Sequence, residues 1–405
     1  MSSDSLVPET RVLAIASHVA YGFVGNTMAT FVMQSLGCDV AAINTVHFSN
    51  HTGYRQVKGT KATAEEISAL YEGLNQSYLT DFDVLLSGYA PSAAAVEAVG
   101  EIALDLRRKS RGKPGSFFWV LDPVMGDQGR IYVNEDVVPA YKKIVHHADL
   151  ILPNQFEAEL LSGIKITSLT NLADAITVLH RTYNIPHIIV TSVHLPALTS
   201  ISSSASSTIS HSTTDNSNSS SNPDTTRSDN LTIIGSSACS DGSPRLFKIE
   251  VPRIDCFFSG TGDMFAALTV ARLREAVYAA DPDPTTTAAA APTTLLRNTP
   301  SWLSPDTVPA TQLPLAQATE KVLASMHGIL EKTMLERNAE LARYPADDEE
   351  NDEEFAGLDE AERKAAVEKR AYLRATKAAE VRLVRNVGLL KVPNVVFRAE
   401  EWKAS

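Results

Sequence analysis

The fold is decided by a stretch near the N-terminus that reads Arg11-Val12-Leu13-Ala14-Ile15-Ala16 and runs into Ser17-His18. The run is short and apolar, which predicts a buried strand. Helical spacing follows at residues 26–36, and Gly37 is a typical signal for the end of a helix. The chain therefore opens with a strand, a loop and a helix.

The same unit recurs along the chain. Further strands are predicted at residues 38–43, 82–88, 117–122, 148–152 and 187–192, and helices at 64–74, 93–108, 157–161 and 172–183. Continuous apolar strands between amphipathic helices are typical of a parallel sheet covered on both faces. In such sheets, ligands bind at the carboxyl ends of the strands. The polar residues at these ends are Ser17, Asp122, Asn154, Thr191 and Ser192.

Composition narrows the class of protein. The 405 residues are 44% hydrophobic and 21% charged, which is enough for a large core. A net charge of −12 disfavours broad contact with nucleic acid or an anionic membrane. The sequence shows no bilayer-spanning apolar run and no secretory signal pattern. We therefore expect a cytoplasmic protein, with the nucleus as a second compartment and without nucleic-acid or membrane partners.

Three segments differ from this core in composition. Residues 197–245 are rich in Ser, Thr and Asn, which predicts a disordered insertion that extends a hairpin. Residues 281–314 combine Ala, Pro and Thr and predict a second, flexible insertion. Residues 345–383 contain an acidic run and then a charged helix from about 359 to 383. This last segment is either a partner-binding tail or a solvated charged helix, and the second interpretation is favoured.

A glycine loop with a carboxylate stands late in the sequence, Gly260-Thr261-Gly262-Asp263, and an apolar run follows it. Glycines let the backbone approach a ligand closely, and the apolar run predicts a buried helix. A helix N-terminus presents free N–H groups and binds phosphate. Asp263 is then either a simple cap or a base that takes a proton from the group attacking the phosphate. The second interpretation predicts a kinase that acts on an alcohol.

This loop is the last of several motifs that occur in order along the chain. The others are Ser17-His18-Val19, residues 48–54 (Phe-Ser-Asn-His-Thr-Gly-Tyr), Ser87-Gly88-Tyr89, residues 122–127, residues 153–160 and Thr191-Ser192. Together they resemble the pyridoxal kinase family of the ribokinase-like superfamily, over about residues 11–196 and 245–275. The resemblance implies a single kinase domain across residues 1–405. Its implied fold class is α/β, a ribokinase-like three-layer α/β/α sandwich with a mostly parallel central sheet.

The resemblance also implies roles for single residues. Asp263 is the expected catalytic base toward the 5′-hydroxyl of pyridoxal, pyridoxine or pyridoxamine, with ATP as co-substrate. Substrate contacts are implied for Ser17, Thr52, Tyr89 and Asp263. ATP contacts are implied for Asp122, Asn154, Glu157, Thr191, Ser192, Asp255, Cys256, Gly260, Thr261 and Gly262. The expected product is pyridoxal 5′-phosphate or a related vitamer, which assigns the chain to vitamin B6 salvage, and the family pattern implies a homodimer.

Cation sites follow from the same resemblance. It implies that Asp127 and Glu157 bind Mg²⁺. It also implies that Asp122, Thr191 and Gly260 bind a monovalent cation such as K⁺ or Na⁺. Asn154 and Glu157 have an alternative role as capping residues of the helix that follows.

The chain departs from the family pattern at two positions. Leu152 stands where the family commonly has Thr, which removes one oxygen ligand and leaves the monovalent cation preference open. Ser259 stands where an apolar residue is usual.

Two rival functions are weaker on the sequence. A hydroxymethylpyrimidine kinase often carries Cys at the position of Asp263 and lacks the Ser-Asn-His-Thr-Gly-Tyr run that stands here at residues 49–54. A non-catalytic vitamin-binding protein with the same fold would be favoured by loss of Asp263 or of the glycines, and both are present. The sequence therefore favours a pyridoxal kinase.

Overall fold

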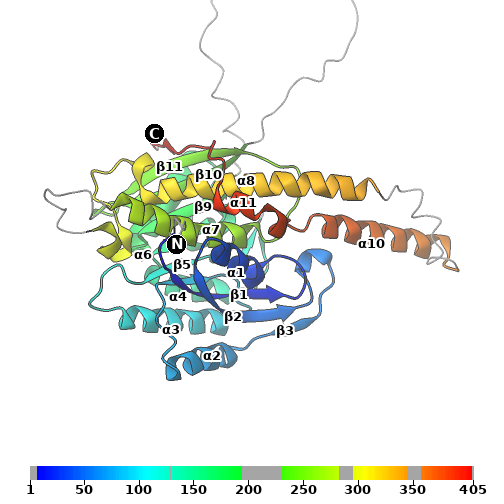
Figure 1. The fold of residues 1–405 in the computed structure, drawn as a ribbon, viewed down its shortest axis with the longest axis horizontal. Helices are drawn as coiled ribbons and strands as arrows, with labels where there is room; N and C mark the ends of the chain where they lie inside the picture. The colour runs from blue at the N-terminus through cyan, green and yellow to red at the C-terminus, as the bar shows by residue number, and fades with distance from the viewer. Residues whose placement is uncertain (1–6, 128, 194–229, 282–294, 344–356, 404–405) are drawn as a thin grey trace, which may run out of the picture.

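A computed structural model describes residues 7–127, 129–193, 230–281, 295–343 and 357–403 of the chain. Within these residues, a ten-stranded sheet lies between two layers of helices (Figure 1), which confirms the predicted three-layer α/β/α arrangement. The strands are β1 (Arg11–Val19), β2 (Asp39–Phe48), β3 (Gly59–Lys61), β4 (Val84–Ser87), β5 (Phe118–Leu121), β8 (Leu150–Ile151), β9 (His187–Val193), β10 (Asn230–Ala238), β11 (Pro244–Pro252) and β12 (Glu400–Glu401).

The strand order places a ligand site at the centre of the sheet. The order is β12-β11-β10-β9-β8-β5-β4-β1-β2-β3, and the strands from β2 through β1, β4, β5 and β8 to β9 are parallel. Antiparallel strands complete both edges. From β1 the chain passes to β2 on one side and then to β4 on the other. The carboxyl ends of β1 and β4 therefore flank a switch point, where open α/β sheets bind ligands.

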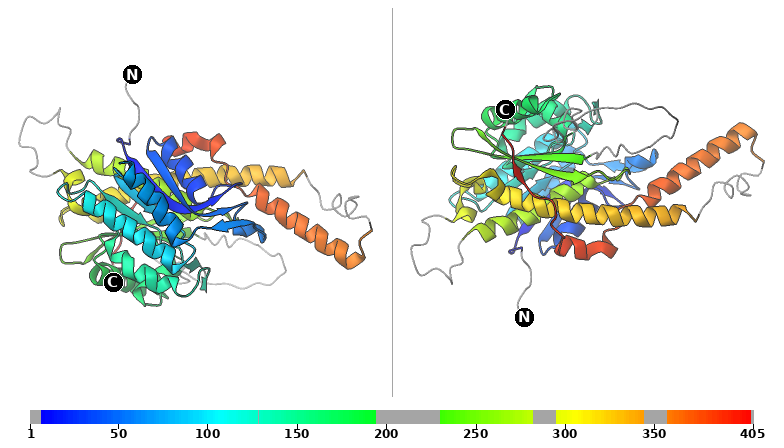
Figure 2. Two further views of the ribbon diagram at one scale, coloured as in Figure 1. Left: turned by 90° about the horizontal axis from the view of Figure 1, so that it is seen from below. Right: turned by 90° about the horizontal axis from the view of Figure 1, so that it is seen from above.

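Helices cover both faces of the sheet (Figure 2). On one face lie α1 (Gly25–Ser35), α7 (Thr261–Ala280) and α8 (Pro314–Leu341). On the other lie α2 (Ala64–Gln76), α3 (Ala93–Lys109), α4 (Val137–Ile144), α5 (Gln155–Ser162) and α6 (Leu169–Tyr183). Side chains of β1 alternate between the two apolar clusters, with Val12 and Ala14 in one and Leu13 and Ile15 in the other. Burial on both faces explains the uninterrupted apolar strands of the sequence.

The prediction for residues 197–245 is wrong at its carboxyl end. Residues 194–229 lie outside the described residues, but Asn230–Ala238 forms β10, which pairs antiparallel with β9 and with β11. Ile233 and Ile234 are fully buried, one in each apolar cluster. The apolar run that contains them stabilises an inner strand, so the compositional bias ends before β10.

The prediction for residues 281–314 is wrong over its second half. Residues 282–294 lie outside the described residues, whereas residues 295–313 contain three short 3₁₀ turns that pack on the core, and Pro314 begins α8. The ring of Trp302 is buried and stacks on Phe118 at a centroid distance of 4.0 Å. A single buried aromatic ring offsets the ordering cost of several residues, and composition averaged over the segment hides it.

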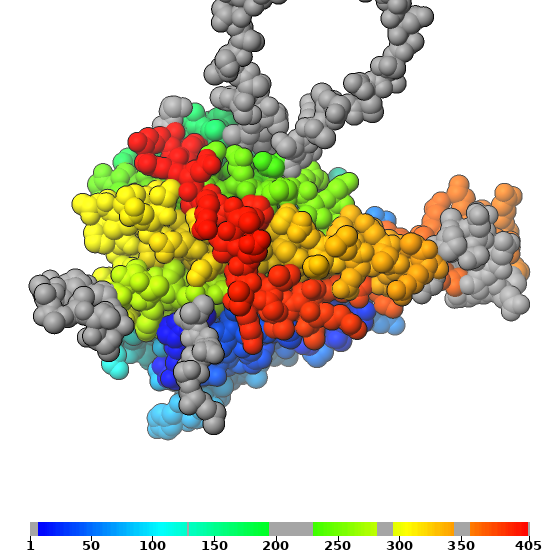
Figure 3. All heavy atoms as spheres, turned by 45° about the horizontal axis from the view of Figure 1, so that its top comes forward, coloured from blue at the N-terminus to red at the C-terminus, as the bar shows by residue number. Residues whose placement is uncertain are grey.

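The charged helix is present as α10 (Glu360–Ala378), a little shorter than predicted, and the acidic run before it lies outside the described residues. It begins with a capping box of Asp359 and Glu362, and only Ala378 of its residues is buried. The chain then continues into α11 (Val387–Lys391), which packs on α1 and α8. In the space-filling view this C-terminal part runs over the surface of α8 (Figure 3). None of the described helices is both long and apolar enough to cross a membrane.

Candidate active site

The glycine loop begins helix α7 as the sequence predicts. Gly260 is the N-cap residue and has a φ of 80°, which favours glycine. A β-carbon at this position would lie 2.2 Å from the carbonyl oxygen of Phe23. The close contact between these two backbone segments therefore also excludes any residue larger than glycine. Asp263 stands in the first turn of α7, where free N–H groups attract phosphate.

The carboxylate of Asp263 is oriented from outside its own helix. It accepts a hydrogen bond from the backbone N–H of Gly25, the first residue of α1. Burial raises the pKa of Asp263 to about 6, and this hydrogen bond opposes the shift. Gly25 in turn packs on Ser17, because a β-carbon at Gly25 would lie 2.0 Å from the Ser17 carbonyl oxygen. The predicted base and a predicted substrate residue are therefore linked through Gly25.

Three carboxylates gather behind this loop. Burial raises the pKa of Asp122 well above its usual range, and the negative charges of Glu157 and Asp263 raise it further. A β-carbon at Gly262 would lie 3.8 Å from Asp122 Oδ2, which places Asp122 against the glycine loop. None of the three carboxylates forms a salt bridge with another described residue. The site therefore concentrates negative charge that a bound cation would neutralise.

Asn154 and Glu157 form a capping box at the start of α5. Helix capping was the alternative to nucleotide or cation binding for these two residues. The Asn154 side chain accepts the Glu157 N–H at 2.9 Å, and Glu157 Oε2 accepts the Asn154 N–H at 2.9 Å. Glu157 Oε1 also accepts the Met125 N–H at 2.9 Å, and Asn154 Nδ2 donates to the Gly126 oxygen at 2.8 Å. The two residues therefore hold the hairpin of β6 (Gly126–Asp127) and β7 (Arg130–Ile131) against α5. Burial raises the pKa of Glu157, and these hydrogen bonds oppose the shift.

A cavity of about 480 Å³ opens beside this hairpin. It joins Asp127 and Ser192, both predicted on the nucleotide side, with the basic residues Arg253 and Lys165. Isolated basic residues on separate loops have no local pattern, so the sequence did not point to this pair. We interpret the cavity as the nucleotide side of the site.

The segment before α5 is fixed to β9. Thr191 of β9 donates its N–H to the Pro153 oxygen at 3.0 Å, next to Asn154. Leu152 is buried in the apolar core, and its side chain carries no oxygen that could bind a cation.

The predicted substrate residues come from three segments around the glycine loop. Ser17 lies near the end of β1, and the half-buried Tyr89 lies just beyond β4, where its carbonyl accepts the Thr45 hydroxyl at 2.7 Å. Thr52 is exposed in the 3₁₀ turn η1 (Thr52–Tyr54). A β-carbon at Gly53 would lie 3.3 Å from Ser259 Oγ, so η1 adjoins the glycine loop.

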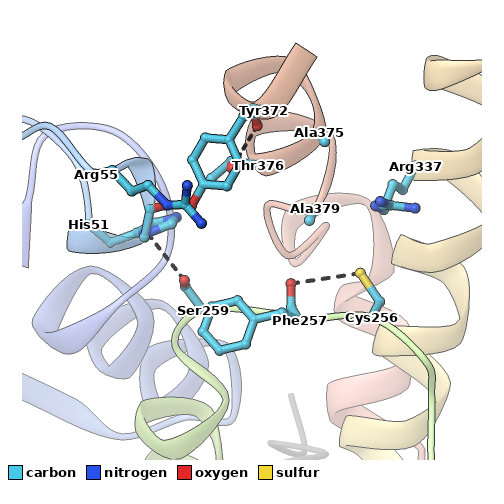
Figure 4. Close-up of a pocket in the computed structure, with 11 residues that line it drawn as sticks. His51, Arg55, Cys256, Phe257, Ser259, Arg337, Tyr372, Ala375, Thr376 and Ala379 are labelled. Atoms are coloured by element: carbon cyan, nitrogen blue, oxygen red, sulfur yellow. Dashed lines mark hydrogen bonds between the residues drawn. The ribbon is translucent and has the colours of Figure 1, made fainter. Parts of the chain in front are cut away.

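A second cavity, of about 400 Å³, lies on this side (Figure 4). Its walls come from η1, the loop before α7, α8 and α10, and include His51, Cys256, Ser259 and Tyr372. Cys256 therefore lines a different cavity from Ser192, although both are predicted ATP contacts. Asp255, the remaining predicted contact of this loop, is exposed beside Cys256.

Tyr141 of α4 is a buried residue that sequence reasoning missed. Its hydroxyl has no hydrogen-bond partner among the described residues. Burial raises its pKa well above the usual range, and the charges of Asp122 and Glu157 raise it further, so it lies close to the carboxylates. In the sequence it is indistinguishable from a core aromatic. The described residues contain no group of three or more His, Cys, Asp or Glu side chains able to hold a metal ion by themselves.

A mostly parallel sheet between helical layers, with a carboxylate in a glycine loop at a helix N-terminus, defines a ribokinase-like kinase. Comparison with known proteins specifies the family. Residues 32–227 match the family described as phosphomethylpyrimidine kinase. Pyridoxal kinase from Ovis aries is 36% identical over 272 residues, which are 65% of this chain and 77% of that protein. The pyridoxal kinase of Homo sapiens is 35% identical over the same shares of both chains.

A solved structure agrees over almost the whole chain. It is pyridoxal kinase from Leishmania donovani in complex with ADP and pyridoxamine, with a TM-score of 0.66 and 26% identity over 97% of this chain and 100% of that chain. The chain described here belongs to the pyridoxal kinase family.

Proposed function

We propose that the chain transfers the γ-phosphoryl group of ATP to the 5′-hydroxyl of pyridoxal, pyridoxine and pyridoxamine, in vitamin B6 salvage. The observation that carries this proposal is Asp263, a carboxylate with a raised pKa in a glycine loop at a helix N-terminus. Family membership supports the vitamin as substrate. Structures of the Leishmania donovani enzyme hold ADP with pyridoxamine or with pyridoxine.

In the proposed reaction Asp263 accepts the proton of the 5′-hydroxyl while that oxygen bonds to the γ-phosphorus. The bond between the γ-phosphorus and the bridging oxygen breaks, and ADP leaves with the electron pair. The free N–H groups of the first turn of α7 stabilise the charge on the transferring group. A positioned base of this kind contributes about 10²–10⁴ in rate. Asp122, Asn154, Glu157, Thr191 and Ser192 serve the nucleotide side.

The carboxylate cluster fits bound cations, because Asp122 carries a raised pKa that neighbouring negative charges increase. We propose Asp127 and Glu157 for Mg²⁺, and Asp122, Thr191 and Gly260 for a monovalent cation. When bound, these cations neutralise charge on the phosphate oxygens. The protein itself contributes the fixed hairpin and the glycine loop that set where the phosphates lie.

An ADP-release assay tests the proposal against its closest rival. Purified protein is given ATP with pyridoxal, pyridoxine or pyridoxamine, and separately with hydroxymethylpyrimidine. We expect release with the three vitamers and little with the pyrimidine, because Asp263 and the run at residues 49–54 favour the pyridine substrate. Release with hydroxymethylpyrimidine alone would overturn the assignment. Release with none of the four would favour a binding protein without catalysis.

Assembly and location are further proposals. We propose a homodimer, because the family pattern implies one, and light scattering of the purified chain measures its mass directly. We propose a cytoplasmic enzyme, with the nucleus as a second compartment, and fluorescence microscopy of a tagged chain tests this.

A further inference from the structure

His51 connects the glycine loop to the C-terminal part of the chain. Its Nδ1 lies 3.1 Å from Ser259 Oγ (Figure 4), and its Nε2 lies 3.1 Å from Glu380 Oε1. Both His51 and Glu380 are largely shielded from water, with side chains 10% and 11% exposed. An ionised carboxylate only accepts hydrogen bonds, so Nε2 donates to Glu380, while Nδ1 shares a hydrogen bond with the Ser259 hydroxyl. Ser259, His51 and Glu380 thus form one chain of hydrogen bonds.

Glu380 also contacts two other segments close to the predicted substrate residues Ser17 and Thr52. Its Oε1 accepts the hydroxyl of Tyr54 at 2.9 Å. A β-carbon at Gly22 would lie 2.6 Å from Glu380 Oε2, and Gly22 has a φ of 98°, so the backbone before α1 packs directly on this carboxylate. One side chain therefore joins the loop that follows Ser17 to the turn that carries Thr52.

A second contact anchors the same turn. Tyr372 of α10 donates its hydroxyl hydrogen to the carbonyl oxygen of Gly53, and the guanidinium of Arg55 lies 4.1 Å from the centre of the Tyr372 ring. The C-terminal part of the chain thus holds residues on both sides of Thr52.

Turn η1 depends on such external contacts for its shape. It is a single 3₁₀ turn, a form with weaker hydrogen-bond geometry than an α-helix. It ends at Arg55, which has a φ of 56°, an unfavourable backbone angle for a residue other than glycine. Thr52 is exposed, and its carbonyl accepts the Arg55 N–H at 2.9 Å. The position of its hydroxyl therefore follows from the anchors at His51, Gly53 and Tyr54.

We propose that Glu380 is a positioning residue for the vitamin site, acting through His51 and Tyr54 to hold Thr52 beside the glycine loop. This inference rests on the proposed function and deepens it. Ser259 completes the arrangement, because its hydroxyl bonds to the other ring nitrogen of His51 and so fixes the orientation of the ring. The cavity that joins Asp127 and Ser192 has none of these residues in its walls, so we expect a larger effect on the vitamin than on ATP.

Kinetics of Glu380→Ala test the proposal. Losing hydrogen bonds to a charged group costs about tenfold or more in affinity, so we expect KM for pyridoxal to rise about tenfold. We expect KM for ATP to stay within about twofold, because none of these residues lines the cavity of Asp127 and Ser192. Glu380→Gln keeps an acceptor oxygen and is expected to recover most of the affinity. Ser259→Ala is expected to raise KM for pyridoxal by about threefold.

The control is Glu368→Ala, which removes an exposed carboxylate from α10 and is expected to leave both KM values unchanged. A wild-type KM for pyridoxal in folded Glu380→Ala would overturn the inference. So would an equal rise in both KM values, or a Glu380→Gln variant as defective as Glu380→Ala. If Glu380→Ala does not fold, Tyr54→Phe replaces it and is expected to show the same split. Failure of the proposed function is distinguishable, because the wild-type protein would then not phosphorylate pyridoxal at all.

Discussion

The backbone N–H of Gly25 donates a hydrogen bond to the carboxylate of Asp263 and so links the first turns of α1 and α7. The two helices are neighbours on one face of the sheet. Gly25 packs against Ser17 at the end of β1, so a residue assigned to the substrate and the residue assigned as the base share one support. The site is therefore coupled to the core of the sheet.

Replacing the base tests its role directly. We expect Asp263→Asn to lower kcat by about 10²–10⁴, because the amide cannot accept the proton of the 5′-hydroxyl. Binding of pyridoxal should persist, and the melting temperature should not fall, because the substitution removes a partly buried charge. Steady-state kinetics, calorimetry and a binding titration provide the three measurements. A kcat close to the wild-type value would show that Asp263 is only a structural residue.

Activity should depend on pH through Asp263. Burial raises the pKa of this carboxyl to about 6, so the base is ionised at neutral pH and becomes protonated below that value. We expect kcat/KM for pyridoxal to fall about tenfold per pH unit below pH 6, provided that the fold persists. A profile that stays flat down to pH 5 would exclude Asp263 as the titrating base.

The stability of the fold should change with pH in the opposite direction to activity, through the same carboxyl group. A folded pKa above the ordinary value means that the folded state binds this proton more tightly than the unfolded state, so ionisation of Asp263 costs stability as pH rises through about 6. Asp263→Asn removes this cost. We expect its melting temperature relative to wild type to be higher at pH 7.5 than at pH 5, as measured by calorimetry at both values. An equal difference at the two pH values would contradict the raised pKa.

Gly260 is expected to tolerate no side chain. Gly260→Ala would place a β-carbon 2.2 Å from the Phe23 oxygen and so would displace the loop that carries Asp263. We expect kcat to fall more than about 100-fold, because a shift of about 1 Å costs that much in a positioned site. Gly357→Ala is the control, since Gly357 also has a positive φ, 96°, but open space around it. Equal losses in the two variants would attribute the effect to backbone strain alone.

The Ser/Thr/Asn-rich segment should be dispensable only up to β10. Deleting residues 200–225 removes almost no large apolar side chain, so we expect the melting temperature and kcat to stay near wild type. Ile233→Asp places a charge in the buried core and should prevent folding or lower the melting temperature sharply. Circular dichroism and the ADP-release assay measure both outcomes. A large loss on deleting 200–225 would show that this segment packs on the core.

Much of the fold could be predicted because its elements depend on local patterns. The strand predicted at residues 11–16 is β1 (Arg11–Val19), and the helix predicted at 93–108 is α3 (Ala93–Lys109). Such elements follow from side-chain periodicity within a few residues. The end of the Ser-rich segment and the burial of Trp302 were missed, because a single apolar residue decides burial there while composition averages over the whole segment.

The sequence by itself determined the alternation of strands and helices, the glycine loop with Asp263, and the order of motifs that indicates the family. Only the tertiary structure decided which loops meet. Tyr54 and Glu380 are 326 residues apart and share a hydrogen bond, and Cys256 and Ser192 line different cavities. The physical reason is that periodicity reports how each segment contacts its own neighbours. Contacts between distant segments depend on how complete layers pack, which no local pattern records.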